Sequence, residues 1–166
     1  MILLSFDIEE FDMPLEYEGT ISLEEQLSVS RKGLQNILRI LKKHQIKATF
    51  FSTVIFAENN QDLIQELLSD GHELASHTWF HSDFEEKHLL ESKLRLEELF
   101  NTKIIGLRMP RMSPVSDDAV ANAGYFYNSS INPTFLPGRY NNLKVNRTAF
   151  WQNNVLQMPA SVSPLF

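Results

Sequence analysis

Short apolar runs alternate with amphipathic stretches along most of the chain. Residues 2–6 form an apolar run that stops at acidic side chains, and residues 46–56 are rich in β-branched and aromatic residues, so both predict strands. Between them, residues 27–44 carry apolar side chains at helical spacing and end in two lysines and a histidine. Basic residues in a last turn are typical of a helix C-terminus, so this stretch predicts a helix.

The same alternation continues as far as residue 131. Further strands are predicted at residues 72–76, 103–110 and 125–131, and further helices at residues 60–71, 87–100 and 116–124. Strands that alternate with helices predict βαβ units and a parallel sheet, which is either open or closed into a barrel. From residue 132 the pattern changes to a turn-rich loop, followed by irregular strands between residues 143 and 160.

The composition fits one domain over residues 1–166, with 43% hydrophobic residues to build a core. A net charge of −6 argues against the basic surface that nucleic acid requires, and the lack of cysteine excludes disulfides and cysteine-based zinc sites. The first five residues contain no lysine or arginine, and the chain has no apolar run long enough to span a membrane. We therefore expect a cytoplasmic protein, whose oligomeric state is left open.

Three of the five histidines lie within the stretch "GHELASHTWFHSDF". His77 and His81 are spaced i, i+4, so a helical or tightly turned segment would point both imidazoles the same way, toward a shared metal ion. Such a pair needs a third ligand, which Glu9 or Glu10 would supply in a two-histidine, one-carboxylate site with open positions for water. Asp7 is then the candidate to take a proton from that water.

These groups follow the ends of successive predicted strands, as does the segment "RMPR" that contains Arg108 and Arg111. In parallel α/β folds the ligand site lies at that edge of the sheet, so a shared site is expected there. The alternatives are plainer: a histidine pair on a surface, a solvated acidic turn at residues 9–12, and a structural ion pair for Arg108. We expect His72 to be structural and His88 to face solvent.

The segments "LSFDIEEF", "SHTWFHSDF" and "LRMPRMS", in this order, resemble the first three motifs of the polysaccharide deacetylase family. This is the family of metal-dependent carbohydrate esterases that includes chitin and peptidoglycan deacetylases. The segment "GYFYNSSINPTFLPGRYNN" resembles a bacterial branch associated with cell-surface polysaccharide biosynthesis. The resemblance implies an α/β fold, a distorted, incomplete (β/α) barrel with parallel strands. Since the family's last motif is not found, it also implies a catalytic domain truncated after Phe166.

By position, the resemblance assigns Asp7 as the catalytic base and His77 and His81 as metal ligands. Some branches place the metal carboxylate two residues after the base, which favours Glu9 over Glu10, and Asp7 and Glu9 share one side of a strand. Arg108 matches the arginine that pairs with and orients the base. The backbone N–H of Arg111 matches the donor that holds the oxyanion.

The reaction implied is hydrolysis of an N- or O-acetyl group on a saccharide, by a metal-bound water that Asp7 activates. The cofactor is a divalent metal, with zinc as the default for this ligand set. The family's general acid is a late histidine, whereas no histidine follows His88 here, so the identity of the general acid is left open. Two alternatives remain: a cyclic amide or ureide hydrolase on the same scaffold, and a catalytically inactive saccharide-binding domain.

Overall fold

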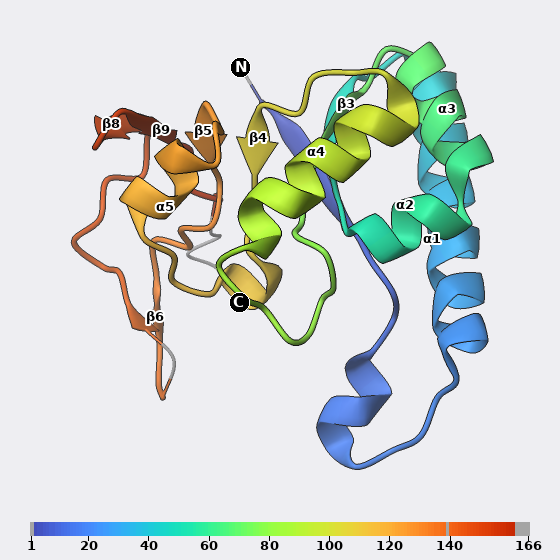
Figure 1. Cartoon of the computed structure of the whole chain (residues 1–166), viewed down its shortest axis with the longest axis horizontal. Helices are drawn as coiled ribbons and strands as arrows, with labels where there is room; N and C mark the ends of the chain where they lie inside the picture. The colour runs from blue at the N-terminus through green and yellow to red at the C-terminus, as the bar shows by residue number, and fades with distance from the viewer. Residues whose placement is uncertain (1, 139, 162–166) are drawn as a thin grey trace.

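The centre of the fold is a mostly parallel sheet, seen in a computed structural model that describes residues 2–138 and 140–161 (Figure 1). In the described ranges its strand order is β1-β2-β3-β4-β5-β9-β8. The strands are β1 (Leu4–Ile8), β2 (Ala48–Ser52), β3 (Glu73–Ser76), β4 (Gly106–Leu107), β5 (Tyr127–Asn128), β8 (Phe150–Gln152) and β9 (Val155–Gln157). The first five strands are parallel and adjacent in chain order, as in a (β/α) barrel, without the reversal of strand order seen in Rossmann sheets.

Helices connect these strands and cover one face of the sheet. They are α1 (Leu23–His44), α2 (Val54–Asn59), α3 (Gln61–Ser69), α4 (His88–Phe100) and α5 (Asp117–Asn122), with the 3₁₀ turns η1 (Met13–Tyr17) and η2 (Pro110–Met112). A small hairpin, β6 (Phe135–Leu136) with β7 (Tyr140–Asn141), lies apart from the sheet. In Figure 1, α1 and α3 run side by side along one flank, and α4 crosses in front of β3 and β4.

The predicted α/β class with parallel strands is confirmed, but three predicted strands are too long. Residues 103–110 form a strand only at Gly106–Leu107, and residues 125–131 only at Tyr127–Asn128. The third, residues 46–56, ends as a strand at Ser52, and α2 begins at Val54. The reason is Thr53, whose side-chain oxygen accepts the backbone N–H of Phe56 at 3.2 Å and so caps a new helix. The expected truncation after Phe166 falls outside the described residues, among which no helix is both long and apolar enough to cross a membrane.

Adjacent side chains of β2 separate the two faces of the sheet. Phe50 packs with Leu34 and Leu38 of α1 in the main hydrophobic core, whereas Phe51 joins a second, smaller cluster with Tyr127. The hydroxyl of Tyr127 donates to Glu73 at 3.1 Å, and burial raises the pKa of this tyrosine well above its ordinary value. One face therefore carries the helices, and the other forms the interior side of the incomplete barrel.

Gly106 in β4 is the position where this interior face tolerates no side chain. A Cβ added there would overlap the phenol ring of Tyr127 on the neighbouring strand. We expect Gly106→Ala to lower the free energy of unfolding by about 1–3 kcal/mol, because a well-packed neighbour must move. Urea denaturation measures this change.

The matched control is Gly33→Ala in the interior of α1. A Cβ at Gly33 would meet no atom within 4 Å, and alanine favours the helix by about 0.5–1 kcal/mol, so this variant is expected to be slightly more stable. Equal effects of the two substitutions would contradict the close packing of Tyr127 over β4.

Candidate metal centre

Three side chains from two strand ends and one loop converge at the carboxyl edge of the sheet. Glu9 directly follows β1, His77 directly follows β3, and His81 lies in the loop before α4. His77 Nε2 is 2.9 Å from Glu9 Oε2, and His81 Nε2 is 3.3 Å from Glu9 Oε1. Because the ends of β1, β2 and β3 are in register, the residues that follow them emerge at the same height.

The other ring nitrogen of each histidine fixes its tautomer. His77 Nδ1 is 2.8 Å from the backbone oxygen of Arg108, and His81 Nδ1 is 2.8 Å from Asp12 Oδ1. A carbonyl oxygen and an ionised carboxylate only accept hydrogen bonds, so in the neutral rings Nδ1 carries the proton. Both Nε2 atoms therefore turn a free lone pair toward the carboxylate of Glu9.

This donor set fits a divalent metal ion. Glu9 Oε2 is buried and finds no hydrogen-bond donor in the part of the chain that the structure describes. Lone pairs and a carboxylate that face one another repel unless a cation lies between them. Tetrahedral zinc, with bonds of about 2.1 Å, separates its ligand atoms by about 3.4 Å, close to the separations of 2.9 and 3.3 Å found here. Three protein ligands also leave a coordination position open for water or substrate.

The structure brings the carboxylate of Glu9, and not that of Glu10, to the Nε2 atoms of the two histidines. The Glu10 side chain is buried, accepts the hydroxyl hydrogen of Thr53 at 2.7 Å, and accepts the backbone N–H of His81 at 3.1 Å. Its carboxylate is thus engaged in holding the His81 loop against the start of α2. A solvated acidic turn does not describe this segment, because Glu10 and Asp12 are each only 7% exposed.

Asp7 lies in β1, two residues before Glu9, and its carboxylate forms an ion pair with Arg108. Arg108 Nη1 donates to Asp7 Oδ1 at 2.7 Å. The same guanidinium donates to the hydroxyls of Ser5 and Ser129, each at 2.9 Å, and lies over the ring of Phe51 at 4.2 Å. With its orientation fixed on several sides, Arg108 aims the carboxylate of Asp7, which is 32% exposed and so accessible to water.

Arg111 occupies an unusual backbone conformation within η2. Its φ of 55° lies in the left-handed region, and its side chain bonds Glu16 at 2.7 Å and Asp12 at 3.2 Å. The turn is closed by the N–H groups of the next two residues, and in residues 2–138 and 140–161 no backbone hydrogen bond uses the N–H of Arg111. That N–H is therefore left for another acceptor.

Two of the three remaining histidines have structural explanations. His72 is buried at the start of β3, where Nδ1 accepts the N–H of Ala48 at 3.1 Å, so a structural role agrees with the prediction. Burial lowers the pKa of His72 below its ordinary value. The prediction that His88 faces solvent is wrong: it is 8% exposed and packs beside Trp79 and Phe84.

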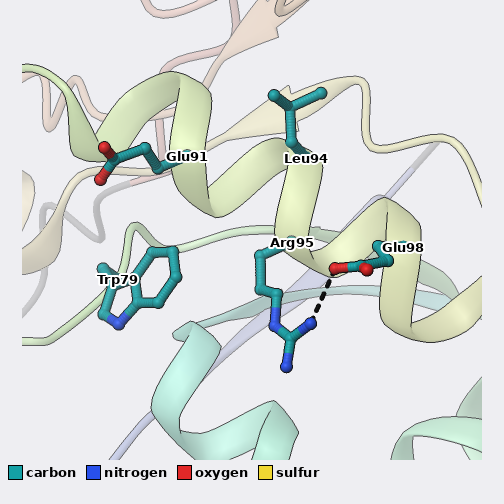
Figure 2. A pocket seen from close by; sticks show the side chains of 5 residues that line it. All are labelled: Trp79, Glu91, Leu94, Arg95 and Glu98. Atoms are coloured by element: carbon teal, nitrogen blue, oxygen red, sulfur yellow. Dashed lines mark hydrogen bonds and ion pairs between the residues drawn. The ribbon is translucent and has the colours of Figure 1, made fainter.

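A shallow hollow of about 670 Å³, wide open to solvent, lies on the outer side of α4 (Figure 2). Trp79 forms one wall, and Glu91, Leu94, Arg95 and Glu98 of α4 form the others. None of its lining residues is a member of the Glu9–His77–His81 cluster. Trp79, although it stands between the two histidines in sequence, also packs against the main core. Its role here is packing.

Sequence reasoning missed the residues that support the site. Asp12 accepts from His81, Ser82 and Arg111, and Ser129 helps to hold Arg108. An acidic residue near a metal motif is a general signal for such support, but nothing in the spacing distinguishes Asp12 from Glu10.

Comparison with known proteins finds relatives of this chain. A family model described as polysaccharide deacetylase matches residues 2–125. A chitooligosaccharide deacetylase from Bradyrhizobium sp. (strain ANU 289) is 38% identical over 48 residues, which is 29% of this chain and 22% of the relative.

Two solved structures match most of the chain. The probable polysaccharide deacetylase from Pseudomonas aeruginosa PAO1 gives a TM-score of 0.74 at 19% identity, covering 96% of this chain and 61% of that one. The Puue allantoinase gives 0.73 at 19% identity, again covering 96% and 61%. At this identity the two structures show the shared fold alone. The matched part of this chain spans less than two thirds of each relative's length.

Proposed function

Since this chain belongs to the polysaccharide deacetylase family, we propose that it hydrolyses acetyl groups on a saccharide with the help of a divalent metal, zinc in the first instance. The observation that carries the proposal is the convergence of two imidazole lone pairs and one carboxylate beside a carboxylate that an arginine orients. The branch resemblance in the sequence supports a place in cell-surface polysaccharide biosynthesis.

The ligands are Glu9, His77 and His81. A divalent metal held by them would polarise the acetyl carbonyl group and lower the pKa of an attacking water. His77 and His81 keep their Nε2 lone pairs directed at it, because each Nδ1–H is bonded elsewhere.

Asp7 is the general base. Its carboxylate is close in sequence to the ligand Glu9 but is bonded to Arg108. It takes the proton from the water that attacks the acetyl carbon. Arg108 holds this carboxylate in one orientation, and the unused N–H of Arg111 donates to the oxygen that becomes negative.

Release of an amine also needs a proton on the departing nitrogen, and no histidine follows His88 in these 166 residues. An aryl acetate avoids this requirement, since its phenolate leaves without protonation. Two substrates are therefore used. An aryl acetate tests the attack of water alone, and an N-acetylated chitooligosaccharide tests the whole reaction, including protonation of the leaving amine.

The zinc-loaded chain is expected to hydrolyse the aryl acetate faster than the same chain after treatment with a chelator. Acetate release from the chitooligosaccharide is likewise expected to be faster with the zinc-loaded chain than with the chelated chain. Reloading with zinc is expected to restore both rates. The measurement is acetate formed with time, with zinc in buffer and chelated protein as the two controls.

The alternatives give different results. Ring opening of allantoin without acetate release would support a ureide hydrolase instead. Binding of the acetylated oligosaccharide by a zinc-loaded chain that hydrolyses neither acetate substrate would support an inactive saccharide-binding domain. Either result overturns the proposed deacetylase activity.

A further inference from the structure

Asp12 has a buried carboxylate that bonds two other segments of the site, the His81 loop and η2. Its Oδ1 accepts from His81 Nδ1 at 2.8 Å, and its Oδ2 accepts from the Ser82 hydroxyl at 2.8 Å and from Arg111 at 3.2 Å. Its side chain is only 9% exposed. A buried carboxylate with three donors fixes the positions of the groups that bond to it.

The two metal-facing histidines have different partners at Nδ1. His77 donates to a neutral backbone oxygen, that of Arg108, whereas His81 donates to the anionic carboxylate of Asp12. An anionic partner makes the far nitrogen of the ring a stronger electron-pair donor and holds the ring in one plane. The orientation of the His81 ring therefore depends on one side chain, that of Asp12.

The Asp12 carboxylate is also tied to the neighbouring turns. Arg111, which bonds Asp12, bonds Glu16 of η1 at 2.6 Å as well. These ion pairs connect η1 and the residue before it to η2, although Asp12 and Arg111 are 99 positions apart in the sequence. In Figure 1, η1 projects from the body of the fold on a long segment, so these contacts secure that segment beside the site.

We propose that Asp12 is a positioning residue that selects the Nδ1–H tautomer of His81 and directs its Nε2 to the metal, an inference that rests on the proposed metal site. Asp12 is not a member of the Glu9–His77–His81 cluster. Its carboxylate acts through His81, and the side chain of Arg111 keeps that carboxylate in place.

The test uses two substitutions at Asp12. Asp12→Ala removes the acceptor, and Asp12→Asn can turn an amide N–H toward His81 Nδ1, which would place the ring proton on Nε2 where the metal must bind. Both are expected to weaken zinc binding by about 10–100-fold, with Asn at least as damaging as Ala. Asp83→Asn, an exposed change in the loop that carries His81, is expected to leave the zinc affinity unchanged.

A second readout needs no metal. In the chelated protein, nitrogen-15 NMR reports which nitrogen of each imidazole carries the proton. In the unaltered chain both His77 and His81 are expected as the Nδ1–H form. In Asp12→Asn and Asp12→Ala, His81 is expected to change or become mixed while His77 stays the same.

The outcomes separate the two proposals. A wild-type chain that binds no zinc would overturn the proposed metal site. A chain that binds zinc with equal affinity in wild type and both Asp12 variants, with His81 still in the Nδ1–H form, would overturn the role of Asp12 alone. Because His77 is measured in the same sample, a general loss of folded structure would be visible as a change in both rings.

Discussion

The double variant His77→Ala/His81→Ala is expected to lose its bound zinc, from about one equivalent per chain to none. Both Nε2 atoms face the same carboxylate of Glu9, so their removal leaves a single protein ligand. The measurement is elemental analysis after the protein is stripped with a chelator, reloaded with zinc and desalted. Hydrolysis of the aryl acetate is expected to fall to the rate of the chelated wild-type chain.

Two further variants make this result specific. His77 is buried, and its loss leaves the backbone oxygen of Arg108 without its donor, so the double variant is also expected to be less stable. Glu9→Gln keeps the size of the side chain and removes only the charge, and it too is expected to reduce zinc binding strongly. His44→Ala, an exposed change at the end of α1, is expected to retain the metal.

Full zinc content in the double variant would exclude a site built on these histidines. Full zinc content in Glu9→Gln alone would instead mean that Glu9 is not the third ligand. Circular dichroism on each variant separates loss of the site from loss of the fold.

Asp7→Asn is expected to lower the rate of aryl acetate hydrolysis by about 10²–10⁴-fold while the zinc content stays at the wild-type level. Asp7 is bonded to Arg108 and is not a member of the Glu9–His77–His81 cluster. In the proposed mechanism its charge would serve proton transfer and not metal binding. The amide is the same size but cannot accept the proton of the attacking water. The rate constant at saturating zinc and the zinc content are measured on the same preparation.

The matched control is Asp118→Asn, an exposed change at the start of α5, for which no change in rate is expected. An unchanged rate in Asp7→Asn would remove Asp7 from the role of base. Loss of zinc in Asp7→Asn would show that this carboxylate supports the metal, which the present arrangement does not predict.

Much of the fold could be predicted because its signals are local. The apolar runs, the helical spacing in α1 and the basic residues at its end all act within a few turns of chain, and they predict alternating strands and helices. The strand predicted over residues 46–56 extends too far, into the helix that begins at Val54. Val54 to Phe56 have strand-like side chains, and a single hydroxyl at Thr53 decides that they begin a helix.

The candidate site divides in the same way. The sequence by itself determined that His77 and His81 stand four residues apart and that Asp7 and Glu9 stand two residues apart at the end of a strand. These relations depend only on the geometry of neighbouring residues. They were sufficient to indicate a metal site at the carboxyl edge of a parallel sheet.

Only the tertiary structure decided how the acidic residues after β1 divide their roles. Glu9 faces the histidines, Glu10 turns to Thr53, and Asp12 bonds His81 and Arg111. Beyond the end of a strand the direction of a carboxylate is no longer set by alternation. It is set by which side chains and backbone groups the other loops bring near it, and those groups lie 43 to 99 positions away in the chain.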